Sequence, residues 1–146
     1  MKCPTCSSET RVLESRDISD STAIRRRREC KDCEHRFTTY ERPELSVRVV
    51  KKDGTREEFD QDKLKKGIMK SCEKRPVSNE DVEELIRNVV KKIRRKGINE
   101  IDSTEIGNLV MEELKDLDKV AYIRFASVYK SFDLESLEKE IKTIKR

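Results

Sequence analysis

The sequence of 146 residues has little that enzymes commonly use for catalysis. It contains one histidine, no tryptophan and only four glycines, and aromatic residues make up 5% of the chain. No grouping of serine, histidine and aspartate suggests a nucleophilic triad. Neither of the glycine-rich phosphate-binding loops, G-x-x-x-x-G-K-[ST] or G-x-G-x-x-G, is present. We therefore do not expect an enzyme.

Long apolar runs are also missing. No stretch approaches the roughly 18 uninterrupted apolar residues that span a membrane. The chain opens Met1-Lys2-Cys3-Pro4, without the apolar segment of a secretory signal behind it. We therefore expect a small cytoplasmic protein with no membrane partner.

Charged residues are abundant instead. They make up 44% of the chain, against roughly 25% in an ordinary soluble domain. Because 34 Lys+Arg face 30 Asp+Glu, the net charge is only +4, and the placement of charge is more informative than its sum. The 34% of hydrophobic residues suffice for one core of roughly 100 residues plus an appendage.

Four of the five cysteines form two C-x-x-C pairs, Cys3 with Cys6 and Cys30 with Cys33. Two such pairs supply the four thiolates of a structural Zn²⁺ site, in which every coordination position is filled by protein. Disulfides, a thioredoxin-type redox pair and an iron–sulfur cluster are the alternatives. Disulfides are disfavoured in a chain without a secretory signal. We expect one structural Zn²⁺ per chain.

The character of the sequence changes near Pro43. The cysteine pairs and a loop-like segment over residues 15–22 precede it, and helical periodicity dominates after it. We therefore expect an α+β protein of three segments: a zinc ribbon over residues 1–45, a mostly helical domain opening with a β-hairpin over 46–132, and a helical tail over 133–146.

Residues 46–59 have the pattern of two extended segments joined by a turn. Asp53-Gly54 between them predicts a tight hairpin turn in which both central residues have positive φ. Asp60 is suited to N-cap a following helix, which we expect Pro76 to end. The apolar face of that helix would comprise Leu64, Ile68 and Cys72, so Cys72 is expected to be a buried thiol.

Three further helices and the tail are predicted from apolar spacing. The first has a capping box of Ser78 and Asp81 and ends near Gly97. The next begins near Ser103, and Asp118 caps the last. The tail repeat is too short to be stable alone, so it must pack on the body or on a partner. The four expected apolar faces are Val82, Leu85, Ile86, Val89, Val90 and Ile93; Ile106, Leu109, Val110 and Leu114; Ala121, Phe125, Val128 and Phe132; and Leu134, Leu137, Ile141 and Ile144.

Four consecutive arginines, Arg25 to Arg28, lead into the second cysteine pair. Solvation, or neutralisation of the thiolate charge around zinc, would explain some of them, but nucleic-acid phosphates are the better-matched partner. Alternate side chains of a strand point to opposite faces, so Arg25 and Arg27, or Arg26 and Arg28, would face one duplex, but hardly all four. The candidate DNA-binding residues are Arg16, Arg25, Arg26, Arg27, Arg28, Lys31 and Arg36.

A second concentration of charge surrounds the hairpin. Lys51 and Lys52 precede the turn, and Glu57 and Lys63 return near them. Ammonium groups beside the N–H groups of a helix N-terminus would suit a triphosphate. A solvated, charged hairpin without a ligand explains the same residues, so chemistry alone leaves both interpretations open.

Several stretches of the chain occur in the order found in one known family. They are Cys3-Pro4-x-Cys6, Ser15-Arg16, residues 24–28, Cys30-x-x-Cys33, and residues 36–41, 49–54, 74–78 and 117–129. Through them, about residues 1–132 resemble the NrdR family of bacterial transcriptional repressors of ribonucleotide reductase genes, which join a zinc ribbon to an ATP-cone. One departure is Glu14, where the family commonly has aspartate.

The resemblance implies that ATP and dATP bind as allosteric ligands, with Mg²⁺, and are not consumed. The phosphates would be held by Lys51, Lys52 and Lys63. The carboxylates of Glu57 and Asp60 would meet sugar hydroxyls or a Mg²⁺-bound water, and Val49 would pack on the base. Tyr122 and Tyr129, seven residues apart on one helix face, would flank the purine. Packing in the core is the alternative for both tyrosines.

The resemblance also implies a homo-oligomer whose size depends on the bound nucleotide and whose ribbons bind double-stranded operator DNA. Such a protein would be cytoplasmic, and associated with the nucleoid when bound to DNA. Two other classes remain. A zinc-ribbon nucleic-acid or polymerase-associated protein would use its helical part for protein contacts and bind no purine nucleotide. An enzyme, such as a nucleotide hydrolase or a reductase fragment, would show turnover.

Overall fold

The computed structural model describes residues 1–130 and 132–145. The chain folds into two compact units, Met1–Glu44 and Leu45–Arg146, which we call the N-terminal and C-terminal units. Strands and helices both occur, as expected of an α+β protein. Within the described residues, no helix has the length and apolar character needed to cross a membrane.

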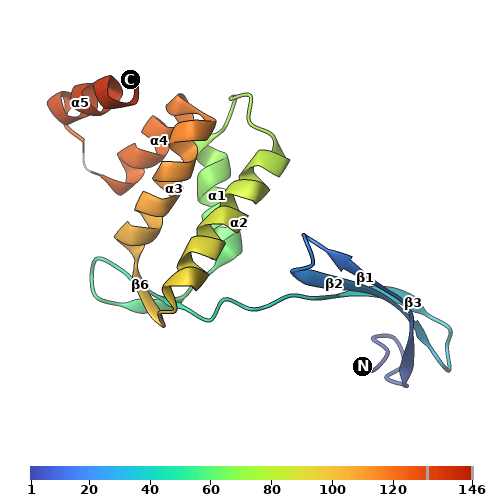
Figure 1. Ribbon diagram of the computed structural model, residues 1–146. Helices are drawn as coiled ribbons and strands as arrows, with labels where there is room; N and C mark the ends of the chain where they lie inside the picture. The colour runs from blue at the N-terminus through green and yellow to red at the C-terminus, as the bar shows by residue number, and fades with distance from the viewer. Residues whose placement is uncertain (131, 146) are drawn as a thin grey trace. The chain divides into compact units, whose positions relative to one another are not determined.

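The N-terminal unit is a three-stranded antiparallel sheet in the order β1-β2-β3 (Figure 1). Its strands are β1 (Thr10–Ile18), β2 (Ala23–Cys30) and β3 (Arg36–Glu41). The expectation of a loop or turn over residues 15–22 is correct for residues 19–22, which form the turn between β1 and β2. It is wrong for residues 15–18, because β1 continues to Ile18 and pairs there with Ala23. Pairing with β2 holds these polar residues extended, since the partner strand overrides their weak local β-propensity.

The C-terminal unit combines a small sheet with a set of helices (Figure 1). The sheet has the order β5-β4-β6 and contains β4 (Arg48–Val50), β5 (Arg56–Glu58) and β6 (Glu100–Asp102). The predicted hairpin of β4 and β5 is confirmed, whereas β6, which pairs in parallel with β4, was not predicted. The helices are α1 (Gln61–Ser71), α2 (Asn79–Lys96), α3 (Ser103–Leu117), α4 (Lys119–Tyr129) and α5 (Leu134–Lys145).

The hairpin turn differs from the predicted two-residue turn. Of its two central residues, Gly54 alone has positive φ, at 85°. The Gly54 N–H donates to the Lys51 carbonyl at 2.9 Å, and the Lys51 N–H donates to the Thr55 carbonyl at 2.8 Å. The loop therefore has three residues and closes with glycine in the left-handed region. Asp53 does not adopt a positive φ, and its carboxylate accepts the N–H and the hydroxyl of Thr55.

The predicted caps of the first two helices are confirmed. Asp60 accepts the N–H groups of Asp62 and Lys63 at the start of α1, and Ser78 and Asp81 form a reciprocal capping box at the start of α2. The end of α1 differs from the prediction, because the helix stops at Ser71, well before Pro76.

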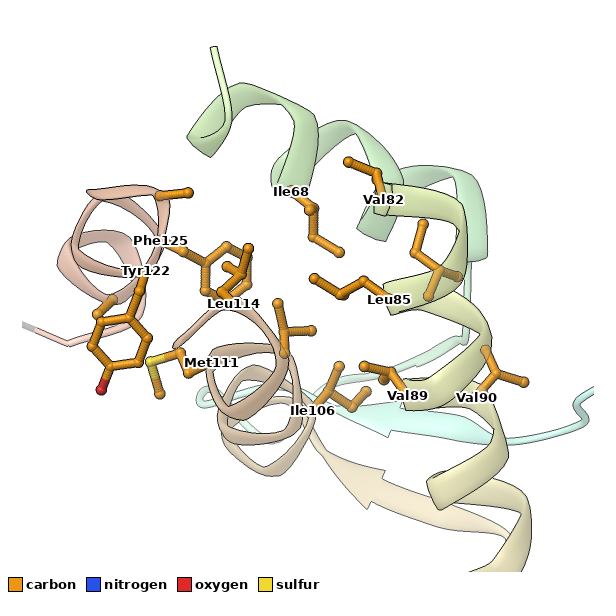
Figure 2. Packing of buried hydrophobic residues seen from close by; sticks show 14 of the residues in the cluster. Ile68, Val82, Leu85, Val89, Val90, Ile106, Met111, Leu114, Tyr122 and Phe125 are labelled. Atoms are coloured by element: carbon orange, nitrogen blue, oxygen red, sulfur yellow. The ribbon is translucent and has the colours of Figure 1, made fainter. Parts of the chain in front are cut away.

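A single apolar core holds α1, α2, α3 and α4 together (Figure 2). All six apolar residues predicted for α2 are buried, as are Ile68 of α1 and Leu114 of α3. The predicted face of α4 is wrong in part, since Val128 is 81% exposed and Tyr122 and Ala126 are buried instead. This helix is short and packs on two sides, so its buried stripe turns away from Val128.

The tail helix α5 packs on the body of the same chain. Ile144 is buried, and the Tyr122 hydroxyl of α4 donates to the Glu140 carboxylate of α5. Leu134, at the start of the predicted apolar seam, is 81% exposed, and Leu137 and Ile141 are half-buried.

Asp118 joins α3 to α4 and lies almost entirely out of solvent. Its carboxylate accepts the Ala121 N–H at 2.8 Å, which caps α4, and forms an ion pair with Arg75 at 3.0 Å. Burial by itself would raise the pKa of Asp118, but the Ala121 amide and the Arg75 guanidinium outweigh it and hold the pKa below its ordinary value. The ionised form therefore stabilises the fold.

We expect Asp118→Asn to lower the free energy of unfolding at neutral pH by about 1 to 2 kcal/mol, because the ion pair is lost. The pKa of such a carboxyl is lower in the folded state than in the unfolded state, where it is roughly 4. The carboxylate therefore stabilises the fold fully above the unfolded-state pKa, and this contribution is lost as the pH falls through the folded-state pKa. The difference between wild type and variant should therefore shrink below about pH 4.

Urea unfolding across a pH series measures this effect. Asp116→Asn, which removes an exposed carboxylate two positions earlier, is the matched control and should change stability by less than about 0.5 kcal/mol. A pH-independent difference for Asp118→Asn would contradict the assigned role.

Candidate functional site

The four paired cysteines converge at one end of the N-terminal sheet. Their Sγ atoms all lie within 4.8 Å of one another, and the pairs from opposite motifs are closest: Cys3 to Cys33 at 3.7 Å and Cys6 to Cys30 at 3.4 Å. Four sulfurs around a tetrahedral Zn²⁺, each at about 2.3 Å, are about 3.8 Å apart. All four cysteines are free, so the donor set and its spacing fit zinc.

Each C-x-x-C pair is followed by a tight turn. Ser7 and Glu34 have positive φ, at 63° and 61°, and these turns aim both sulfurs of each pair inward. A backbone N–H group also points at the cluster, since the Thr5 N–H donates to the sulfur of Cys3 at 3.4 Å. Hydrogen bonds from Ser8 lower the pKa of Cys6 to about 6, whereas burial and the neighbouring thiols raise the pKa of Cys33.

The arginine run occupies β2, the central strand of this sheet. Directly opposed residues of antiparallel strands share a face. Arg25 lies opposite Arg16 and therefore shares a face with Arg27, whereas Arg26 and Arg28 lie on the other face. The run is thus divided between two faces, as strand alternation predicts.

Each face combines paired and unpaired arginines, and on the second face Arg28 donates to the Thr39 hydroxyl at 3.4 Å without an ion pair among the described residues. Arg27 donates to the Thr38 hydroxyl at 2.9 Å, which orients the guanidinium and leaves its charge unpaired. Arg26 lies 3.8 Å from the Glu41 carboxylate on the other face. Among the described residues, Arg25 forms no ion pair and Arg16 pairs with an exposed Glu14.

Two further candidate DNA-binding cations, besides Arg16 and Arg26, are held by acidic residues of the ribbon itself. Glu29 is buried and binds Arg11 at 2.8 Å and Arg36 at 3.4 Å. The Arg11 hydrogen bond is the main reason that the pKa of Glu29 lies below its ordinary value. Lys31 pairs with Glu9 at 3.2 Å. Arg36 and Lys31 are therefore partly neutralised.

A cavity of about 520 Å³ lies in the C-terminal unit between the β4–β5 hairpin, α1, the start of α3 and the end of α4. Six of the eight candidate nucleotide-binding residues line it: Val49, Lys51, Glu57, Asp60, Lys63 and Tyr129. The pocket thus brings the hairpin charges together with an aromatic residue from a helix about 70 positions later.

Glu57 organises the lysines of the pocket. Its carboxylate binds Lys51 at 3.0 Å and Lys63 at 3.2 Å. The Lys51 hydrogen bond, followed by that of Lys63, lowers the pKa of Glu57. Two ammonium groups are therefore held side by side in the lining of the cavity by one carboxylate.

Two candidate residues lie outside the cavity lining. The Lys52 ammonium donates to the Tyr129 carbonyl at 3.2 Å and so ties the hairpin turn to the end of α4. Tyr122 is buried in the core, where desolvation, together with its hydrogen bond to Glu140, raises the pKa of the phenol to about 12. Tyr122 therefore lies in the core cluster and outside the cavity lining.

Sequence reasoning missed two cations that line the cavity, Lys70 of α1 and Arg124 of α4. Lys70 follows Lys63 by seven residues, a spacing that places both on one helix face and could have identified it. Arg124 carries no such signal. Its guanidinium donates to the Glu73 carbonyl at 2.6 Å, beyond the end of α1, and reaches the site only because α4 packs on α1.

The aromatic wall of the cavity is built by Phe125 and Tyr129, whose ring centroids are 4.7 Å apart in a stacked arrangement. Gly107 of α3 makes room for the second ring, since a Cβ at this glycine would lie 2.6 Å from Tyr129. Burial raises the pKa of the Tyr129 phenol. A flat apolar surface therefore lies close to the cations.

A zinc-binding cluster on a small sheet, followed by a helical unit with a cationic pocket, defines a zinc ribbon joined to a nucleotide-binding domain. Two family models match the chain accordingly. Residues 1–41 match the N-terminal domain of transcriptional repressor NrdR-like proteins, and residues 47–135 match the ATP cone domain.

Curated relatives are similar over nearly the whole chain. A transcriptional repressor NrdR of Petrotoga mobilis is 56% identical and covers 99% of both chains. The proteins of that name from Thermotoga neapolitana and Bacillus cereus are 53% and 54% identical, covering 100% and 99% of this chain and 96% of their own. The chain belongs to the NrdR family of transcriptional repressors, a regulatory and not an enzymatic class.

Removal of the metal by a strong chelator should unfold the N-terminal unit and spare the C-terminal unit, because a four-cysteine site supplies folding free energy where little apolar surface is buried. Trypsin should then cut at the arginines of β2, while the helical far-UV circular dichroism persists. Cys6→Ser should have the same effect without chelator, and Cys72→Ser is the control that should not. Survival of protease resistance in the metal-free protein would contradict this role of the cluster.

Proposed function

We propose that this protein represses ribonucleotide reductase genes according to the cellular balance of dATP and ATP. In this proposal the N-terminal unit binds operator DNA, and the C-terminal unit binds the nucleotide and controls the oligomeric state. The protein would work in the bacterial cytoplasm, on the nucleoid when bound to DNA. The observation that carries the proposal is the pocket, which places four cations beside a stacked aromatic pair in a unit that matches the ATP cone.

The pocket suggests a role for each group. Lys51 and Lys63 would exchange the Glu57 carboxylate for phosphate oxygens, with Lys70 and Arg124 as further phosphate ligands, because charge-assisted hydrogen bonds are the strongest that a phosphate can accept. The displaced Glu57 would be free to meet a sugar hydroxyl or a Mg²⁺-bound water.

The remaining candidates divide by geometry. Val49 and Tyr129 would pack on the purine. Asp60 already caps α1 through one oxygen, which leaves the other for the ligand. Lys52 would hold the hairpin against α4, and we do not retain Tyr122 as a nucleotide contact because it lies in the core.

One structural Zn²⁺ would be held by Cys3, Cys6, Cys30 and Cys33, and it would shape the DNA-binding sheet. Of the two faces of this sheet, we propose that the one with Arg16, Arg25 and Arg27 meets the DNA, since β1 adds Arg16 to the two β2 arginines of this face and places no cation opposite Arg26 or Arg28. Phosphate contacts of this kind position the protein, whereas operator choice needs contacts to base edges or a response to DNA shape.

Regulation requires that each nucleotide favour a different oligomer, because a ligand that binds two states equally shifts neither. The dATP-bound protein would form the repressing assembly, in which ribbons are spaced to meet half-sites about one helical turn apart, or a multiple of it. Other assemblies would misplace the ribbons and release the operator.

The phosphate roles predict that Lys51→Ala with Lys63→Ala weakens dATP binding about 100-fold, because two charge-assisted hydrogen bonds are lost. Calorimetry measures the affinity, and light scattering with ATP, dATP, GTP and no nucleotide measures assembly. Lys66→Ala, on the same helix but outside the cavity lining, is the control and should bind normally. Retention of dATP-dependent assembly by the double variant would refute these roles.

The DNA-binding face is tested with paired double variants. If one ribbon neutralises four phosphates, the logarithm of affinity should fall with the logarithm of salt at a slope near −3.6, roughly a 150-fold loss from 50 to 200 mM. Arg25→Ala with Arg27→Ala should flatten this slope by about 1.8 for each bound chain. Arg26→Ala with Arg28→Ala, from the opposite face, should leave it nearly unchanged, and the reverse result would assign the other face.

A further inference from the structure

Helix α1 presents five residues to the cavity, at spacings of three and four. They are Lys63, Leu64, Gly67, Lys70 and Ser71. The middle residue, Gly67, has no side chain, so α1 contributes bare backbone between the pair Lys63 and Leu64 and the pair Lys70 and Ser71. Lys63 and Lys70 flank this backbone, about 10 Å apart along the helix axis at 1.5 Å per residue.

A glycine in the interior of a helix is destabilising relative to alanine, because it loses more backbone freedom on folding. Two structural reasons can justify one: a positive φ, or a neighbour too close for a Cβ. Gly67 has neither, since the glycines with positive φ are Gly54 and Gly97, and a Cβ at Gly67 would meet nothing within 4 Å.

The second glycine in a helix interior shows the contrast. At Gly107 of α3 a Cβ would collide with three ring carbons of Tyr129, at 2.6, 2.8 and 3.2 Å. The fold itself therefore needs Gly107. Gly67 costs stability without relieving any close contact among the described residues, and it lines the cavity.

We infer that Gly67 is a contact position for the nucleotide: its missing side chain lets the ligand lie directly against the backbone of α1 between Lys63 and Lys70. The contact is one of shape and not of hydrogen bonding, because backbone groups inside a helix are already paired and the Ser71 hydroxyl also donates to the Gly67 carbonyl, at 3.2 Å. This inference rests on the proposed function, and it adds a residue that limits how much room the ligand has.

The consequence is a substitution with opposite effects on stability and binding. Gly67→Ala should raise the Tm of the nucleotide-free C-terminal unit by about 4 °C, because alanine is the better helix former and meets no neighbour. The same methyl group should weaken ATP and dATP binding about tenfold or more, since it occupies space that the ligand needs. Gly67→Leu should bind more weakly still.

The experiment measures Tm without ligand and affinities for ATP and dATP on the full-length, zinc-loaded protein. Met69→Ala is the matched control, because Met69 is on α1, 45% exposed and outside the cavity lining; its affinity should stay within about twofold, as expected of a surface change remote from the site. Gly107→Ala should lower the Tm, in contrast to Gly67→Ala.

Each outcome has one meaning. A more stable Gly67→Ala protein with weakened nucleotide binding supports the inference. Unchanged affinity overturns it, whether or not assembly changes, and so does a lower Tm, which would show that the fold needs this glycine. Failure of the wild-type protein to bind either nucleotide would instead overturn the proposed function.

Discussion

The pocket of the C-terminal unit depends on one packing interaction, the burial of α1 and α4 in a shared apolar core. Ile68 and Phe125 are both buried in that core, and Lys70 and Arg124, their near neighbours in sequence, line the cavity. The burial of Ile68 and Phe125 thus brings Lys70 and Arg124 together, although these two cationic side chains repel each other. Glu57 and the backbone carbonyls after α1 offset part of that repulsion until an anion binds.

The N-terminal unit is organised by a different constraint. Its buried hydrophobic residues are Cys3, Ala23 and Cys30, far too few to stabilise a sheet of three strands without a bound metal. Because so few hydrophobic residues of this unit are buried, its sheet need not give a whole face to an apolar core, and the central strand can carry four half-buried arginines in succession. The same lack of a core therefore explains the need for a metal and the availability of charged surface for DNA.

Local features were largely predictable from the sequence. The caps at Asp60, Ser78 and Asp118, the apolar stripe of α2 and the β4–β5 hairpin each depend on residues within a few positions of one another, and each was confirmed. Two local details were nevertheless wrong, the two-residue turn at Asp53-Gly54 and the end of α1 at Pro76. Other errors arose where distant segments compete with local preference. Residues 15–18 are extended because β2 pairs with them, and three-residue β6 forms because β4 is beside it.

The sequence by itself determined the class of this protein: the spacing of two cysteine pairs predicts the zinc site, and the order of motifs resembles a family that joins a zinc ribbon to an ATP-cone. The hairpin charges alone left a nucleotide site and a solvated hairpin both open. Only the tertiary structure decided which residues share a site. It placed Tyr129 against the cavity and Tyr122 in the core, added Lys70 and Arg124, and left the backbone bare at Gly67. These outcomes depend on how helices far apart in the chain pack together, and packing is a property of the whole core that no local pattern records.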